Sequence, residues 1–305
     1  MMKKLALSFV VLFLAACATT PAKSNEPYGI LLLAHGGSQR WNESVADVAK
    51  SVDANVPTEV AFGMAQRSAM QSAVERLEAR GVKRIVAVPL FVSSHSSVIT
   101  STEFLLGKRR TAPKDLADFA GMSHGPGGEM HHDMSKMEDG TKPVKTAVPI
   151  LMTNALNAHP IVADILASRV QSLAGDPAGE VVILVAHGPT EEDENRRWLA
   201  DMSKLVKEMK SLQNFHRVEL QTVRDDAEEP IRNAATAELR ARVEKATAEG
   251  KRVIVIPLLI SYGGIEKSIQ KRLDGLKYEM PTQGLLPDPR IANWVRSMAG
   301  EAAGR

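Results

Sequence analysis

The sequence of 305 residues has a single cysteine and almost no net charge. One cysteine excludes an internal disulfide and any four-thiolate zinc or iron–sulfur site. The 38 basic and 36 acidic residues leave a formal charge of +2, which argues against a protein that binds nucleic acid through its phosphates. Hydrophobic residues make up 44% and charged residues 24%, as in an ordinary globular protein. The length suggests about two domains that need no disulfide or metal to fold.

The sequence also lacks an apolar run long enough to cross a membrane at its start. Leu5–Ala16 is uncharged, but its twelve residues would span only about 18 Å as a helix, against a hydrocarbon core of roughly 30 Å. Since Lys3 and Lys4 precede this run, it is typical of a secretory signal peptide over residues 1–16. Cleavage would remove both lysines and leave equal numbers of basic and acidic residues.

The one cysteine directly follows this run. Leu14–Cys17 reads Leu-Ala-Ala-Cys and resembles the lipobox of bacterial lipoproteins. The resemblance implies lipidation of Cys17 and an exported protein that is anchored on the periplasmic side of the bacterial envelope. The alternative is a plain signal peptide with an incidental cysteine. Residues 17–27 lack periodicity and predict a tether.

Beyond the tether, apolar β-rich runs alternate with amphipathic segments. The strand candidates are Gly29–Ala34, Glu59–Gly63, Arg84–Val92, Ala147–Met152, Glu180–Ala186, Arg217–Val223 and Arg252–Ile260, and helical patterns cover Arg67–Arg80, Glu191–Leu212 and Pro230–Glu249. Nearly continuous apolar strands are typical of parallel sheets with helices on both faces. The sequence therefore predicts an α/β fold with doubly wound, mainly parallel sheets, which bind ligands beyond the carboxyl ends of the strands.

The strand motifs occur twice in the same order. Ile30–Gly36 matches Val182–Gly188, and Val88–Phe91 matches Ile256–Leu259. Ordered matches of this kind indicate an internal duplication. The predicted boundaries are 28–174 for the first α/β half, 180–300 for the second, and about 108–146 for an insertion in the first half.

A histidine followed by glycine ends the first strand of each half, His35 in one and His187 in the other. At the carboxyl edge of a sheet, a neutral imidazole can bind a metal or accept a proton. A glycine such as Gly36 lets a ligand approach the backbone closely. A structural histidine that hydrogen-bonds at a strand end is the alternative, and recurrence in both halves fits either interpretation.

A further histidine, His95, follows another buried strand in a serine-rich turn. Because the ends of neighbouring parallel strands meet at one edge of a sheet, we expect His35 and His95 to converge. Two neutral imidazoles form an open metal site, with positions left for substrate or water. The duplicate has Gly263 in place of His95, and this loss of one copy favours a functional role for His95.

These motifs, together with His159-Pro160 ahead of a helical pattern, resemble the sirohydrochlorin cobaltochelatase/ferrochelatase family in its long tandem form. The resemblance covers nearly all of residues 28–300. It implies that a divalent metal (cobalt, iron or nickel) is inserted as a substrate into a sirohydrochlorin-type tetrapyrrole, with no permanently bound cofactor. It also implies that His35 and His95 bind the ion and act in catalysis. The candidate substrate contacts are Gly36, Ser38, Ser94, Ser96 and His187.

The insertion contains an unusual stretch, Gly121–Gly140. Three of the eight histidines and four methionines fall within its first seventeen residues. The stretch is rich in glycine and has no apolar periodicity, so we expect a loop. Histidine and methionine together suit cobalt, nickel or copper. His124, His131 and His132 are therefore candidate auxiliary metal ligands, with a merely solvated insertion as the alternative.

Five other polar positions are of interest. Sirohydrochlorin carries many carboxylates, so Arg40, Lys108 and Arg109 are candidate contacts by position, although most exposed cations are simply solvated. His159, which aligns with Asp288 of the duplicate, is interpreted as a helix N-cap. Glu266 is best explained as an acid stabilised at a helix N-terminus.

The leading hypothesis is a lipid-anchored chelatase whose partners are a tetrapyrrole, a divalent metal and, through its anchor, a membrane, but not nucleic acid. The alternative is a non-catalytic envelope protein that binds or delivers metal or tetrapyrrole. A histidine phosphatase fits poorly, because Ala34 and Ala186 stand where that chemistry usually needs an arginine.

Overall fold

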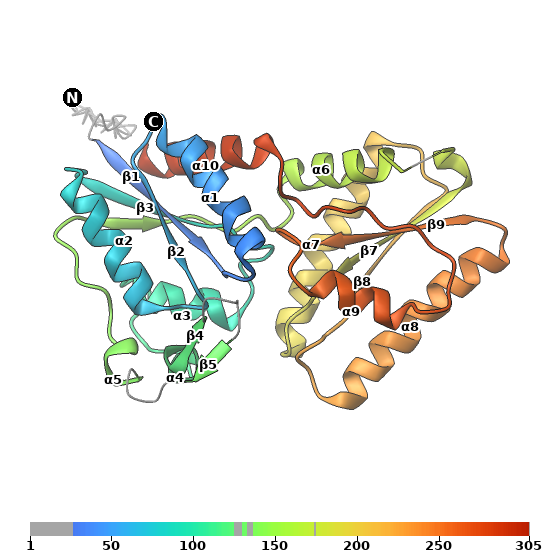
Figure 1. Cartoon of the computed structure of the whole chain (residues 1–305), viewed down its shortest axis with the longest axis horizontal. Coiled ribbons are helices and arrows are strands. Elements are labelled where there is room, and N and C mark those ends of the chain that lie inside the picture. Colours follow the sequence, from blue (N-terminus) through green and yellow to red (C-terminus); the bar gives the residue numbers. More distant parts are fainter. Residues whose placement is uncertain (1–26, 125–129, 133–136, 174, 305) are drawn as a thin grey trace, which may run out of the picture.

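The computed structural model describes residues 27–124, 130–132, 137–173 and 175–304, which form two α/β lobes (Figure 1). The first sheet has the strand order β2-β1-β3-β6, and its parallel strands are β1 Tyr28–Ala34, β2 Thr58–Phe62, β3 Arg84–Pro89 and β6 Ile150–Met152. The second has the order β8-β7-β9, with β7 Glu180–Ala186, β8 Arg217–Thr222 and β9 Arg252–Leu258. The predicted α/β class with two parallel sheets is confirmed. The predicted signal peptide, Cys17 and the tether up to residue 26 lie outside the described residues.

Eight longer helices cover the sheets within the described residues. They are α1 Gln39–Asp53, α2 Arg67–Ala79, α3 Ser97–Leu105, α6 Pro160–Gln171, α7 Glu192–Leu212, α8 Glu229–Ala248, α9 Ile265–Arg272 and α10 Pro289–Ala303. None of the helices in the described part of the chain combines the length and the apolar character that a membrane span requires.

The central strands are buried on both faces, as the apolar runs predict. Along β1, Ile30 and Leu32 face one hydrophobic core, while Leu31 and Leu33 face another, because successive side chains of a strand point to opposite faces. The same alternation along β7 divides its residues between the first of these cores and a third. The first core extends through both lobes and is covered by α1, α10, α6 and α7.

The last helix of each sequence half covers the sheet of the other half (Figure 1). Helix α6 follows the first sheet but packs against α7 and β9 of the second lobe. Helix α10 ends the chain and packs back on α1, β3 and β6 of the first lobe. Each lobe in space therefore consists of one half of the sequence, with its own last helix replaced by the last helix of the other half.

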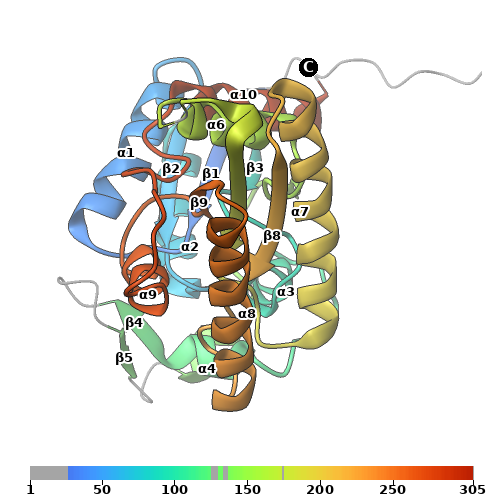
Figure 2. The ribbon, with the colours of Figure 1, turned by 90° about the vertical axis from the view of Figure 1, so that its right-hand side faces the viewer.

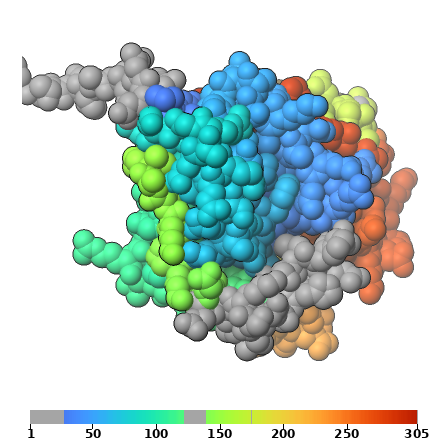
Figure 3. All heavy atoms as spheres, turned by 60° about the vertical axis from the view of Figure 1, so that its left-hand side comes forward, coloured from blue at the N-terminus to red at the C-terminus, as the bar shows by residue number. Residues whose placement is uncertain are grey.

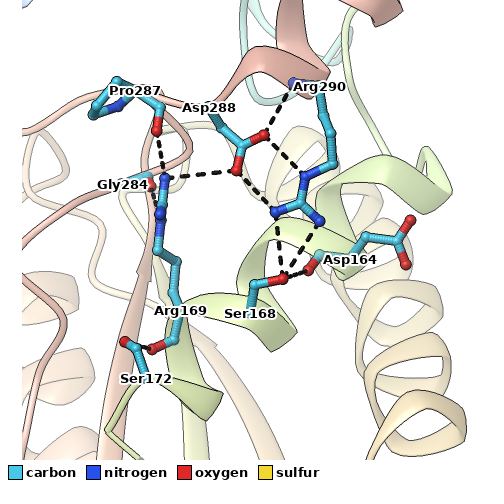
Figure 4. A network of polar contacts seen from close by, with 8 residues as sticks. All are labelled: Asp164, Ser168, Arg169, Ser172, Gly284, Pro287, Asp288 and Arg290. Carbon is cyan, nitrogen blue, oxygen red and sulfur yellow. Dashed lines mark hydrogen bonds and ion pairs between the residues drawn. The ribbon is translucent and has the colours of Figure 1, made fainter.

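A polar network fastens the two exchanged helices together (Figure 4). Arg169 of α6 donates to the carbonyl oxygens of Gly284 (3.1 Å) and Pro287 (2.7 Å) and lies 3.8 Å from the carboxylate of Asp288. Asp288 also accepts hydrogen bonds from the side chain of Arg290. Burial alone would raise the pKa of Asp288, but the hydrogen bonds and charges of Arg290 and the charge of Arg169 outweigh it, so the pKa is lowered.

Both exchanged helices begin with the caps that the sequence predicts. His159 Nδ1 accepts from the backbone N–H of Ile161 at 3.2 Å, and Asp288 accepts from that of Arg290 at 3.0 Å. The ring of His159 also lies edge-on to Trp294 of α10, with the ring centroids 6.4 Å apart. Burial lowers the pKa of His159, which keeps the capping ring neutral and able to accept.

The insertion contains more regular structure than predicted. Two short helices, α4 Leu116–Gly121 and α5 Met137–Gly140, flank an antiparallel pair of strands, β4 Met122–His124 and β5 Met130–His132. The expectation of a loop was wrong here, because strands of three residues are too short to leave a periodic pattern. The chain then returns along α2, where Arg67 and Gln71 donate to backbone carbonyls of Lys142 and Lys145 (Figure 3).

We expect Arg169→Ala to lower the free energy of unfolding by about 2 kcal/mol, because two hydrogen bonds to the crossing segment and an ion pair are lost. Urea denaturation measures the change. The matched control is Arg196→Ala, since the 2.6 Å ion pair of Arg196 with Asp193 is exposed and its loss should cost less than about 0.5 kcal/mol. Equal losses in the two variants would contradict a fastening role for Arg169.

Candidate metal and substrate site

Strands β1 and β3 bring two of the predicted histidines to the same edge of the first sheet. The strands are neighbours and run parallel, with Leu33 paired to Pro89. His35 follows the end of β1, and His95 lies in the turn between β3 and α3. Both side chains are therefore carried by loops at the carboxyl edge, where α/β proteins bind ligands. Convergence of the two rings on one ion stays a prediction.

The loop after β1 fixes the tautomer of His35. Nδ1 of His35 lies 2.7 Å from the carbonyl oxygen of Gly36. Because a carbonyl oxygen only accepts, Nδ1 is the donor, and the lone pair of the neutral ring is on Nε2. Gly36 has a φ of 82°, and Gly188 at the same place in the second half has 75°. A positive φ favours glycine, so the backbone conformation by itself explains why this motif has a glycine.

The serine-rich turn around His95 is held by its own hydroxyl groups. Ser94 Oγ accepts from the backbone N–H of Ala155 (2.9 Å) and from the side-chain amide of Asn157 (3.1 Å). Ser96 accepts from the N–H of Ile99 and caps α3, as Ser38 caps α1. These bonds give the three predicted substrate-binding serines a structural role, and contact with a substrate stays a prediction.

His95 is supported by the second half of the chain. Trp198 of α7 donates from Nε1 to the carbonyl oxygen of His95 at 2.7 Å. Oδ2 of Asp201, one turn further along α7, lies 3.6 Å from Nε2 of His95. A carboxylate on one ring nitrogen favours the tautomer that leaves the other nitrogen, Nδ1, as the lone-pair donor. Metal-binding histidines commonly have such a carboxylate partner.

The corresponding edge of the second sheet has a different arrangement. Nε2 of His187 lies 3.3 Å from Oδ2 of Asp226, which follows the end of β8. Arg224 forms the adjacent turn, since its N–H donates to the carbonyl of His187 at 2.7 Å and its side chain pairs with Glu192 at 2.9 Å. Asp226 was not among the predicted residues, although its place in the turn shortly after a strand was a usable signal. No local signal pointed to Asp201.

The predicted auxiliary ligands lie in the strand pair β4–β5, whose backbone register pairs Met122 with His132, Ser123 with His131 and His124 with Met130. Their side chains lie outside the described part of the structure. Among the described residues, no group of three or more His, Cys, Asp or Glu is placed to hold a metal ion. A metal site built from described residues at the edge of the first sheet would therefore have His35 and His95 as protein ligands and leave its other coordination positions open.

Solved structures of chelatases share this architecture. SirB from Bacillus subtilis with Fe3+ has a TM-score of 0.59 at 16% identity, over 92% of this chain and 98% of that one. The sirohydrochlorin chelatase SirB from Bacillus subtilis subspecies spizizenii in complex with cobalt gives 0.54 at 16%, over the same shares of 92% and 98%. DR2241 from Deinococcus radiodurans, a multi-domain protein with structural similarity to chelatases, gives 0.53 at 17% over 90% of this chain. This chain spans 54% of DR2241, about half its length. The fold is thus chelatase-like.

The model of the CbiX family matches residues 29–173 and, again, residues 181–302. The two matches cover most of the chain, so the protein belongs to the CbiX family, in tandem-repeat form. The family resemblance predicted from the motifs is confirmed. A comparison with curated proteins found no match.

If Asp201 orients His95 for metal binding, Asp201→Asn should weaken Co2+ binding about tenfold, the lower end of the effect of removing a carboxylate behind a metal-binding histidine. A Co2+ titration followed by visible absorption measures the affinity. Asp193→Asn, on the same helix but with a side chain that is 77% exposed and pairs with Arg196, is the control and should bind Co2+ like the wild type. Equal affinities in all three proteins would show that Asp201 has no part in metal binding.

Proposed function

We propose that this protein inserts a divalent metal ion into a sirohydrochlorin-type tetrapyrrole. The observation that carries the proposal is the placement of His35 and His95 in the loops that follow two adjacent parallel strands, at one sheet edge of a CbiX-family fold. The support that α7 gives to His95 adds to it.

The chemistry requires a loosely held ion and two proton acceptors. A divalent ion enters the macrocycle while two pyrrole N–H protons leave, so the charge of the ring and its metal is unchanged by the exchange. Nε2 of His35 and Nδ1 of His95 carry the lone pairs in the tautomers that their contacts favour. Each can hold the ion and, once the ion has left, take one proton.

The metal is proposed as substrate rather than resident cofactor. SirB has been crystallised with Fe3+ and with cobalt, which supports iron or cobalt as the ion inserted here. Nickel has similar affinity for imidazole nitrogen and completes the set to be tested. We further propose that the protein is exported and lipid-anchored through Cys17, as the lipobox-like Leu14–Cys17 indicates.

Mature protein mixed with sirohydrochlorin and Co2+, Fe2+ or Ni2+ should accelerate the absorption change of metal insertion over a protein-free control. His35→Ala and His95→Ala should each lower kcat/KM at least about 100-fold, because each removes a proton acceptor and a ligand. His216→Ala, at an exposed position beside β8, should leave the rate unchanged. Wild-type protein that gives no acceleration would refute the catalytic proposal, and two fully active histidine variants would refute the site.

The second candidate function, metal binding and delivery without catalysis, is favoured by the cluster of histidine and methionine in Gly121–Gly140. Replacing His124, His131 and His132 together by alanine separates the two functions. For a chelatase fed by this segment, the triple variant should lose activity several-fold at limiting metal and recover it at saturating metal, because only delivery is impaired. If the triple variant loses all metal binding and the wild type shows no turnover, the protein is instead a delivery protein.

A further inference from the structure

A cavity of about 300 Å³ lies where the first lobe meets the second. Ser38 and Arg40 from the start of α1 form one wall, and Ser261, Tyr262 and Lys267 around the start of α9 form the opposite one. The crossing segment that leads to α10 closes the cavity from a third side. Figure 2 shows α1 and α9 on the same side of the molecule. Ser38 lies three residues after His35, so the cavity adjoins the proposed metal site along the chain.

Several polar side chains that line the cavity have no polar partner elsewhere in the described part of the chain. Those with no side-chain hydrogen bond or ion pair to another described residue are Arg40, Ser261, Lys267, Thr282 and Gln283. By contrast, Arg224, Arg252 and Arg272 of the second half each pair with a carboxylate. Donors that line one cavity and have no partner among the described residues fit a ligand that supplies acceptors.

The charges around the cavity favour an anion. Arg40 and Lys267 contribute two positive charges, one from each half. The carboxylate of Glu266 also lines the cavity, but it accepts from the N–H groups of Gly263 (3.0 Å) and Gly264 (2.8 Å). Its charge is thus offset locally, in agreement with the helix-N-terminal role predicted for Glu266. The hydroxyl of Tyr262 donates to the carbonyl of Pro281, so it does not stabilise an anion.

The size of the cavity limits what enters it. Sites for small molecules span about 300 to 1,000 Å³, so this cavity is at the lower end. It is too small for a tetrapyrrole ring, but it can hold an acidic side arm of one or a small polycarboxylate. Arg40 lines this cavity together with Lys267, which lies more than two hundred residues further along the chain.

We propose that this cavity binds carboxylate groups, with Arg40 and Lys267 as the charged donors and the hydroxyl and amide groups of Ser261, Thr282 and Gln283 as neutral ones. The carboxylates belong to the acidic arms of the macrocycle, which rests on the proposed function, or to a free polycarboxylate such as citrate. In either case both halves of the chain contribute to one anion site.

The test measures binding without metal, so it does not depend on turnover. Metal-free sirohydrochlorin is titrated by fluorescence and citrate by calorimetry, against wild type, Arg40→Gln/Lys267→Gln and the conservative Arg40→Lys/Lys267→Arg. The loss of each exposed charge pair should weaken binding about fivefold, so the first double variant should raise the Kd of one carboxylate ligand about 20-fold. The conservative variant should restore most of the affinity. Arg197→Gln/Lys207→Gln, with two exposed cations of α7 outside the cavity, is the matched control and should change the Kd less than twofold.

Weaker binding of sirohydrochlorin assigns the cavity to the macrocycle, and weaker binding of citrate alone assigns it to a free polycarboxylate. Unchanged binding of both ligands, failure of wild type to bind either, or an equal loss in the control pair overturns the proposal. If wild type binds sirohydrochlorin through Arg40 and Lys267 but never inserts metal, the anion site stands and the chelatase proposal fails. If wild type inserts metal and both Arg40/Lys267 double variants bind normally, the chelatase proposal stands and the anion site fails.

Discussion

Each sheet of this protein buries one apolar face under a helix that belongs to the other half of the chain, and the rest of the structure depends on that exchange. Helix α10 places Ile291, Trp294 and Val295 in the core of the first lobe, where their exposed fractions are 0–2%. Helix α6 buries Ile165 and Leu166 in the second lobe to the same degree. Separating the lobes would expose all of these side chains, at roughly 1.5–3 kcal/mol for each large one. The halves are therefore a single cooperative unit.

The exchange also fixes how the two carboxyl edges face each other. Because the chain crosses twice between the lobes, the turn after β3 and the turn after β9 each meet the first helix of the opposite half. His95 contacts Trp198 and Asp201 of α7. Gly263, which aligns with His95, lies against Trp41 of α1, where an added Cβ would be 3.2 Å from the indole. The contacts are related as in a twofold dimer, although one covalent chain makes both.

The sequence was informative wherever a local pattern determines a local structure. Apolar runs located the strands to within a few residues, and the residue types before Pro160 and Pro289 predicted the caps of α6 and α10. The exchange of those helices left no such pattern, since an amphipathic face shows that a helix is covered but not which sheet covers it. Asp201 escaped notice for the same reason. It lies more than one hundred residues from His95 and looks like any acid on an exposed helix.

The two ends of the interface between the halves differ in the residue that follows the strand, which is His95 in one half and Gly263 in the other. Beside His95, where Trp198 and Asp201 fill the space, the cavity has only about 10 Å³. At the equivalent position of the second half, glycine allows Trp41 to approach the backbone, and about 300 Å³ stays open between α1 and α9. A side chain at position 263 would place its Cβ 3.2 Å from the indole of Trp41, so a residue larger than glycine there requires the indole to shift. The two halves thus present equivalent edges, and the edge with glycine in place of histidine is the one that has the open cavity. The proposed anion site takes its residues from both halves, whereas the proposed metal ligands His35 and His95 both come from the first half and receive support from α7 of the second.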